Sequence, residues 1–105
     1  MFAIIRRYDG VDQNRSAELT RNVNETLVPK LEKLSGFAGY WLIQDGNVFS
    51  SLSLFETPEQ CKESTKIVTS WIRDEKLETM LPNPPKVTGG EVIVNKVVEK
   101  ELVHA

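Results

Sequence analysis

The stretch GFAGYWLIQDGNVFSSLSLFE, residues 36–56, decides the fold of this chain. Runs rich in aromatic and branched side chains lie on both sides of Asp45-Gly46, and Asp-Gly between two such runs predicts a β-hairpin with a type I′ turn. With these two residues in the turn, Ile43 faces Val48 across the hairpin. The predicted cross-strand pairs are Gln44/Asn47, Ile43/Val48, Leu42/Phe49, Trp41/Ser50, Tyr40/Ser51 and Phe37/Leu54.

One strand and one helix are predicted before the hairpin. Residues 2–8 form a short apolar run that ends at Asp9-Gly10, which is a turn signal. Over residues 16–34, apolar side chains recur every three or four positions, as is typical of a helix with one buried stripe. Pro29 removes a backbone hydrogen bond inside this helix, so we expect a kink or a break there. Gly36 is suited to a left-handed C-cap.

A second helix is predicted directly after the hairpin. Thr57 as N-cap, Pro58 as the first helical residue and Gln60 three residues after the cap form a capping-box start. A further short helical piece is expected over residues 75–81. The residues predicted to face the sheet from the main helix are Cys61, Thr65, Val68 and Ile72, with Ile67 and Trp71 on one flank.

The last strand is predicted over residues 87–102, with a bulge or bend at Gly89-Gly90. The order of elements is then β-α-β-β-α-β. With right-handed crossovers this order folds most simply into an α+β, ferredoxin-like antiparallel sheet with both helices on one face. A chain of 105 residues can build one hydrophobic core, so we expect a single domain over residues 1–105.

The composition argues against several classes of partner. With 13 Lys and Arg against 15 Asp and Glu, the net charge is −2, which offers no basic field for nucleic acid. No apolar run approaches the roughly 20 residues that span a bilayer. The apolar start of the chain precedes Arg6-Arg7, the reverse of the order in a signal peptide. We therefore expect a cytoplasmic protein that binds neither nucleic acid nor membrane. Cys61 is the only cysteine, so neither an intrachain disulfide nor a cysteine-based metal cluster is expected.

Both faces of the predicted hairpin are apolar, although two helices cover only one of them. An exposed apolar surface of several hundred Å² is rare on a monomer and usually marks an interface. We therefore expect a homodimer in which two sheet faces pack about a two-fold axis. The alternative is that the C-terminal segment folds across the open face within one chain. One hairpin face carries Ala38, Tyr40, Leu42, Phe49 and Phe55, and the other carries Phe37, Trp41, Ile43, Val48, Leu52 and Leu54.

Three parts of the sequence together resemble a known superfamily. They are SGFAGYWLIQDGNVFSSLSLFETPEQCKES (residues 35–64), Trp71 in the second helix and GGEVIV (residues 89–94). Over nearly its whole length the chain is similar to the dimeric α+β-barrel superfamily and, within it, to the antibiotic-biosynthesis-monooxygenase (ABM) domains. The resemblance is specific for fold and not for function, because this superfamily includes cofactor-free quinone-forming oxygenases, haem-degrading enzymes and small-molecule isomerases.

The resemblance to the haem-degrading branch fails at two positions. Trp71 matches a tryptophan of those enzymes, but Arg7 and Leu81 stand where they use an asparagine and a histidine. The only histidine of this chain, His104, is the penultimate residue, and an axial haem ligand is not expected on a terminus that normally frays. Neither a haem nor another metal is therefore expected.

The resemblance to the cofactor-free oxygenases implies a pocket between sheet and helices that holds an electron-rich phenol or hydroquinone without a cofactor. Such a pocket needs aromatic walls, a group that stabilises the phenolate, and exclusion of water. The candidate ligand-binding residues are Trp71, Trp41, Tyr40 and Arg7, with Arg6 as the alternative to Arg7. The sequence identifies no catalytic base.

Each of these candidates also has a structural interpretation. A tryptophan on a helix that packs on a sheet is more often part of the core than a ligand wall. Trp41 and Tyr40 point to opposite sides of one strand, as do Arg6 and Arg7, so one member of each pair faces away from the helices. Cys61 is expected to be an inert, buried small residue. Two hypotheses remain: a small enzyme of the monooxygenase-like group, and a non-catalytic dimeric module that binds a hydrophobic small molecule or serves in assembly.

Overall fold

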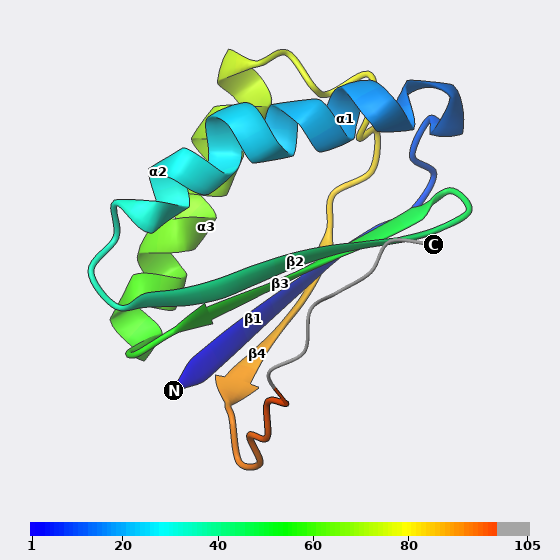
Figure 1. Ribbon diagram of the computed structural model, residues 1–105. Helices are drawn as coiled ribbons and strands as arrows, with labels where there is room; N and C mark the ends of the chain where they lie inside the picture. The colour runs from blue at the N-terminus through cyan, green and yellow to red at the C-terminus, as the bar shows by residue number, and fades with distance from the viewer. Residues whose placement is uncertain (99–105) are drawn as a thin grey trace.

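A computed structural model describes residues 1–98 and has a four-stranded antiparallel sheet with a layer of helices on one face (Figure 1). The strand order β2-β3-β1-β4 places the first strand in the interior of the sheet, as in ferredoxin-like folds. The predicted fold class is therefore confirmed. The elements are β1 (Phe2–Tyr8), η1 (Gln13–Arg15), α1 (Ser16–Asn22), η2 (Val23–Leu27), α2 (Val28–Glu32), β2 (Phe37–Asp45), β3 (Val48–Phe55), α3 (Pro58–Asp74) and β4 (Lys86–Glu91).

The hairpin forms as predicted, but its register differs by one residue in each strand. Gly46 and Asn47 are the two turn residues, so Asp45 pairs with Val48 and Ile43 pairs with Ser50 rather than with Val48. Gly46 has a φ of +59° and no other residue of the turn has a positive φ. This conformation fits a type II′ turn, with glycine first, rather than the predicted type I′ turn. The partners shift by two positions, so the side chains from Tyr40 to Phe55 keep the faces predicted for them, whereas Phe37 does not.

Side chains on the sheet alternate between a face covered by helices and an open face, which we call the outer face. Ile4, Arg6 and Tyr8 of β1 are buried beneath the helices, whereas Ile5 and Arg7 are exposed. A bulge between Phe37 and Gly39 moves Phe37 to the covered side, where its ring packs edge-on against that of Phe55. The outer face comprises Ile5, Arg7, Trp41, Ile43, Val48, Leu52 and Leu54.

The first helical segment neither breaks nor kinks sharply at Pro29. Instead it widens into a π-helical turn, η2, immediately before the proline, and the Val28 amide bonds to the carbonyl of Val23. Because proline has no N–H and its ring clashes with the carbonyl four residues earlier, a wider turn at this point removes the conflict without interrupting the helix. Helix α2 ends at Glu32 with Lys33 as its C-cap, so the predicted helix end at Gly36 is wrong; Gly36 has a φ of +82°, but in the turn that leads into β2.

Helix α3 begins and ends with defined caps. Thr57 and Gln60 form the predicted reciprocal capping box. At the other end, Lys76 adopts a φ of +56°, its amide bonds to the carbonyl of Arg73, and the Leu77 amide bonds to that of Ile72. This is a Schellman motif. It reverses the chain, so residues 75–81 form turns and not the predicted helical piece.

The last strand is shorter than predicted. Strand β4 ends at Glu91, opposite Phe2, and one further bond joins the Val92 amide to the carbonyl of Met1. Because β1 starts there, residues 92–98 have no neighbouring strand among the described residues and take no regular structure. The predicted strand residues 99–102 lie outside the described part. Gly89 and Gly90 pair regularly with β1, so no bulge forms there.

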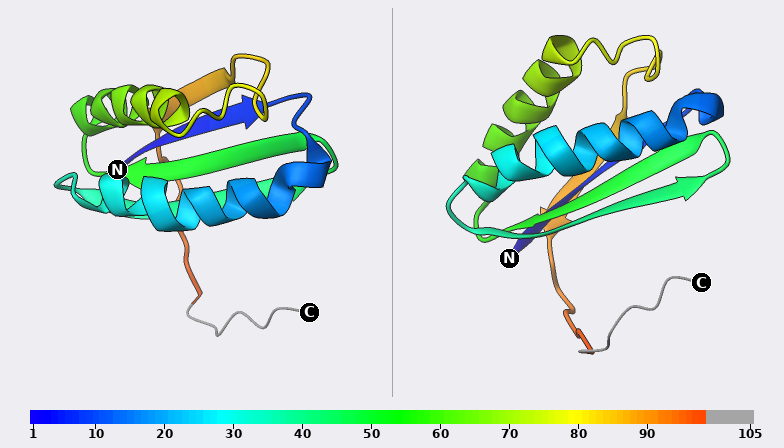
Figure 2. Two further views of the ribbon diagram at one scale, coloured as in Figure 1. Left: turned by 90° about the horizontal axis from the view of Figure 1, so that it is seen from above. Right: turned by 45° about the horizontal axis from the view of Figure 1, so that its top comes forward.

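Residues 92–98 leave the sheet at the side that the helices do not cover (Figures 1 and 2). They carry four strongly exposed apolar side chains, of which Ile93 and Val94 are 89% and 82% exposed. Trp41 and Ile43 on the outer face remain 46% and 58% exposed. In residues 1–98 the outer face therefore stays open. No helix within this range is both long and apolar enough to cross a membrane.

Candidate functional site

A small cavity lies between the helices and the covered face of the sheet, and Trp71 forms one of its walls. We call it the Trp71 cavity. The volume open to the centre of a water molecule is about 20 Å³, which is enough for about one water. Apolar side chains from α1, η2, α3 and the sheet surround it. The lining residues are Tyr8, Leu19, Val23, Leu27, Tyr40, Leu42, Phe49, Ser51, Val68, Trp71 and Leu81.

Trp71 is held in place by a hydrogen bond to the π-helical turn. Its Nε1 donates to Thr26 Oγ1 at 2.7 Å, and Thr26 Oγ1 in turn donates to the carbonyl oxygen of Asn22 at 2.6 Å. Two neighbours of Thr26 in the same turn, Val23 and Leu27, line the cavity. The wide turn and the indole ring therefore form one connected wall. π-helical turns of this kind are frequent at functional sites.

Three of the lining residues bear a hydroxyl group. Tyr8, Tyr40 and Ser51 come from three adjacent strands, β1, β2 and β3. Burial raises the pKa of Tyr40 to about 12, although the hydroxyl of Ser51 lowers it in part. Burial also raises the pKa of Tyr8, against the opposing effect of the Arg6 guanidinium. Near neutral pH both tyrosines are therefore hydrogen-bonding phenols and not bases.

The raised pKa of Tyr40 predicts a loss of stability at alkaline pH. An unfolded tyrosine titrates near about 10, whereas folded Tyr40 titrates near about 12. The contribution is fully present below the unfolded pKa, and it is lost as pH rises through the folded pKa. In a spectrophotometric titration, one of the two tyrosines should ionise about two pH units above the pKa of an unfolded tyrosine. Tyr40→Phe should remove that late transition and weaken the alkaline dependence of unfolding. A normal titration of Tyr40 would contradict its burial.

A groove at the edge of the sheet lies next to the Trp71 cavity, and we call it the edge groove. It shares Val23, Tyr40, Leu42 and Phe49 with the cavity and offers about 320 Å³ to the centre of a water molecule. Strand β2 is the edge strand here, so the groove opens between β2 and the first helical segment. A volume of this size falls at the lower end of small-ligand sites.

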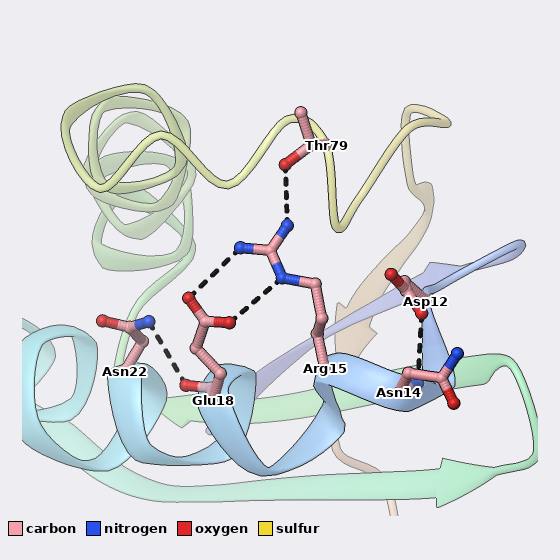
Figure 3. A network of polar contacts seen from close by, with 6 residues as sticks. All are labelled: Asp12, Asn14, Arg15, Glu18, Asn22 and Thr79. Carbon is pink, nitrogen blue, oxygen red and sulfur yellow. Dashed lines mark hydrogen bonds and ion pairs between the residues drawn. The ribbon is translucent and has the colours of Figure 1, made fainter.

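A polar network connects the start of α1 to the loop after α3 (Figure 3). Arg15 forms a fork with Glu18 at 3.0 and 3.2 Å, and its Nη1 donates to Thr79 Oγ1 at 3.0 Å. The same loop carries Leu81, which lines the cavity. Arg15 and Glu18 therefore link the start of α1 to the loop that carries Leu81, a lining residue of the Trp71 cavity.

The structure brings together only two of the four predicted site residues. Trp71 and Tyr40 line the Trp71 cavity, whereas Trp41 and Arg7 lie on the outer face. The ring of Trp41 lies over Gly39, where an added Cβ would meet the indole at 2.7 Å. Arg7 pairs with Asp9 at 3.2 Å near the end of β1. The covered arginine is Arg6, the alternative that the sequence left open.

Tyr8 and Thr26 are site residues that the sequence prediction did not name. Tyr8 lies two residues after Arg6 and four after Ile4 in β1, so its side chain is on the same face of the strand. The alternation of side chains along β1 would therefore have placed Tyr8 under the helices. Thr26 had no comparable signal, because its role depends on the π-helical turn. Cys61 is partly buried, and burial raises the pKa of its thiol, which agrees with the expected inert role.

Comparison with known proteins identifies the fold. No family model and no curated protein matches the sequence. A solved antibiotic biosynthesis monooxygenase superposes with a TM-score of 0.67 at 13% identity, over 90% of this chain and 100% of the other. A monooxygenase of Streptomyces coelicolor, solved in complex with nanaomycin D, gives 0.70 at 15% identity, over 93% and 92%. This chain has the ABM fold.

This chain is also similar in fold to a protein from an uncultured marine organism that is described as a dimeric ferredoxin-like protein. That structure gives a TM-score of 0.69 at 14% identity, over 93% of this chain and 92% of the other. Identities this low establish the ABM fold and no activity, because one fold hosts many functions.

Proposed function

We propose that the protein is a cofactor-independent monooxygenase that acts on an aromatic or polyketide-like small molecule. The observation that carries this proposal is the Trp71 cavity, whose lining combines an indole and apolar side chains with three residues that bear hydroxyl groups, Tyr8, Tyr40 and Ser51. Apolar walls with a few convergent polar groups are typical of small-molecule sites. The ABM fold that the chain shares with two monooxygenases supports the same class of reaction.

In the proposed reaction, molecular oxygen converts a phenol to a quinone. The substrate binds as its phenolate and gives electrons to O₂. A carbon–oxygen bond forms at the para carbon, that carbon loses its proton, and the O–O bond breaks. One phenol and one O₂ then give one quinone and one water, so the substrate is the only reductant and oxygen the only oxidant. The protein's part is to bind the phenolate and orient it.

Two tyrosines stabilise the phenolate in this proposal. Because their pKa values are raised by burial, Tyr8 and Tyr40 remain donors near neutral pH. Donors that face a developing negative charge in a site without water give some of the largest catalytic effects known. Trp71 forms part of the apolar wall around the substrate oxygen in the Trp71 cavity. The phenolic proton leaves to water through the edge groove.

The size of the two spaces sets how the substrate is placed. The Trp71 cavity has room for about one water, whereas the edge groove offers about 320 Å³. The ring system therefore occupies the edge groove and directs its oxygen into the cavity. Tyr40 and Leu42 lie between the two spaces and line both, so a rotation of these side chains is the opening step.

Oxygen consumption with a panel of phenols and hydroquinones tests the proposal. We expect one O₂ to be consumed per quinone formed, measured with an oxygen electrode and by quinone absorbance. Removing one oxyanion donor typically costs about 10²-fold or more in kcat, so Tyr40→Phe should slow turnover by that order. Reactions without protein are the essential control, since hydroquinones also oxidise in water. If no compound reacts faster with the protein than without it, the enzyme proposal is wrong.

The alternative function is a non-catalytic module that binds a hydrophobic small molecule. One observation favours it: the titratable residues that line the Trp71 cavity are the two tyrosines, and a phenol is not a base near neutral pH. This alternative predicts that phenols bind to the cavity and protect the protein from thermal unfolding while oxygen consumption stays at the protein-free rate.

A homodimer formed through the outer face completes the proposal. Ile5, Trp41 and Ile43 are 41%, 46% and 58% exposed there, and neighbouring Leu52 and Leu54 extend the apolar surface. Residues 92–98 do not cover this surface, and the rest of the C-terminal segment that the alternative of an intrachain cover invokes, residues 99–105, lies outside the described part. A two-fold axis would place the outer faces of two chains against each other and remove the exposed side chains from water. The protein of this fold that is described as dimeric supports this arrangement.

A further inference from the structure

Arg6 is a buried cation that has only neutral hydrogen-bond partners. The residue is 2% exposed, and its Nη2 donates to Ser64 Oγ at 3.1 Å and to Thr65 Oγ1 at 2.9 Å. Both hydroxyls donate in turn to the carbonyl oxygen of Cys61. The Nη1 atom of Arg6 is buried and has no partner among residues 1–98. Both N–H donors of Nη1 are therefore unused.

The charge of Arg6 is not balanced by any acid in the described chain. The ion pairs found within residues 1–98 are all at the surface and none includes Arg6. The ionisable groups that act on it are Tyr8, Tyr40 and Cys61, whose own pKa values are raised by burial, so all three are neutral at pH 7. Burial lowers the pKa of Arg6, but an arginine stays protonated in proteins. A buried charge without a counter-charge is costly.

Arg6 lines a pocket between α3 and β4, which we call the Arg6 pocket. The pocket offers about 190 Å³ to the centre of a water molecule. Ile72, Pro85 and Val87 form apolar walls, and the hydroxyls of Thr65 and Thr69 lie on the helix side. The pocket is separate from the Trp71 cavity, since Tyr8 and Val68 lie between the two and line both. One buried cation beneath apolar walls is a site for an anion with an apolar body.

We propose that the Arg6 pocket binds an apolar monocarboxylate, whose carboxylate group pairs with the Arg6 guanidinium. Because both N–H donors of Nη2 are used by Ser64 and Thr65, the carboxylate would accept a charge-assisted hydrogen bond from Nη1. The ligand would supply the missing negative charge and a partner for Nη1, and its apolar body would pack on Ile72 and Val87. This site goes beyond the proposed oxygenase reaction, which uses the Trp71 cavity and the edge groove.

The opposing interpretation is that Arg6 only connects β1 to α3 through Ser64 and Thr65. A purely structural arginine would show no preference for anions. The two interpretations therefore differ in one measurable quantity, which is the affinity of the pocket for a carboxylate relative to a neutral molecule of the same shape.

Benzoate and its neutral isostere benzamide are suitable probes for an NMR titration of ¹⁵N-labelled full-length protein. Benzoate is expected to bind about 10- to 100-fold more tightly than benzamide, as for a charge-assisted pair in a partly dry site. The shifts should occur at amides of α3 and β4 around Thr69 and Val87. Equal affinity for the two probes, or shifts only near Trp71, would overturn the proposal.

Three variants make the test specific. Arg6→Met should abolish the preference for benzoate, and replacing a buried charge with an apolar side chain of similar length is often tolerated. Arg7→Met is the matched control, because Arg7 is the next residue but lies on the outer face, and it should bind benzoate like the unchanged protein. Thr69→Phe fills the pocket without touching the bonds of Arg6 to α3 and should also abolish binding. Unchanged binding in Thr69→Phe would contradict the site even if Arg6→Met fails to fold.

Discussion

Replacing Trp71 with alanine is expected to lower the free energy of unfolding by about 3–5 kcal/mol, the range for truncation of large buried aromatic side chains. The side chain is 3% exposed, and it packs between α3, η2 and the covered face of the sheet. Alanine removes the ring and also the donor that bonds to Thr26 at 2.7 Å. Urea denaturation at one fixed protein concentration measures this loss, because the stability of an associating protein depends on concentration.

Two further variants separate the ring from its hydrogen bond. Trp71→Phe keeps most of the apolar volume and loses the donor, so we expect a smaller cost of about 1–2 kcal/mol. Thr26→Val leaves the indole N–H without an acceptor, and we expect about 1–3 kcal/mol. If Trp71→Ala cost less than about 1 kcal/mol, the surrounding helices would have to collapse readily onto the site. Trp71 would then be a mobile wall and not a fixed one.

Introducing charge on the outer face is expected to convert a dimer into monomers. In the double variant Trp41→Glu/Ile43→Glu, two like charges per chain would face their copies across a two-fold interface. Each desolvated, unpaired charge costs several kcal/mol, so the dimer dissociation constant should rise by about 10³-fold or more. Sedimentation equilibrium measures this change as a shift toward the monomer mass of 11.9 kDa.

Val87→Glu is the matched control for this experiment. Val87 is 52% exposed, close to Trp41 and Ile43, but it lines the Arg6 pocket on the helix side of the sheet. This variant should therefore remain a dimer. A single 11.9 kDa species for the unchanged protein at micromolar concentration would reject the dimer outright. Equal dissociation of the control and the double variant would place the interface elsewhere.

The sequence predicted the two faces of the hairpin correctly but not its register. Asp45-Gly46 and Gly46-Asn47 are both acceptable two-residue turns, and the side-chain pattern fits either one. A shift of one residue in each strand changes the partners and not the faces. The side that meets the helices is decided by tertiary packing. That is why Tyr40 and Trp41, and equally Arg6 and Arg7, remained alternatives until the fold was seen.

The errors at residues 75–81 and after Glu91 share a physical cause. Both segments have side chains suited to the predicted element, but the backbone has no means of continuing it. Lys76 in a left-handed conformation turns the chain away from the helix axis. Beyond Glu91, β1 has ended and no strand is available to pair with the chain. Residue propensity and hydrophobic pattern indicate which secondary structure a segment favours. The available backbone hydrogen-bond partners decide which secondary structure it forms.

Strand β1 carries little information about its own alignment. Its central residues are two duplicates, Ile4-Ile5 and Arg6-Arg7, so on the covered face a slip of one position would put Ile5 in place of Ile4 and Arg7 in place of Arg6. The difference falls on the end of the strand, where the slip would exchange buried Tyr8 for Asp9. Tyr8 therefore distinguishes the native alignment of β1 from the alignment shifted by one residue. A substitution at Tyr8 would reduce the preference for placing Arg6 rather than Arg7 under the helices.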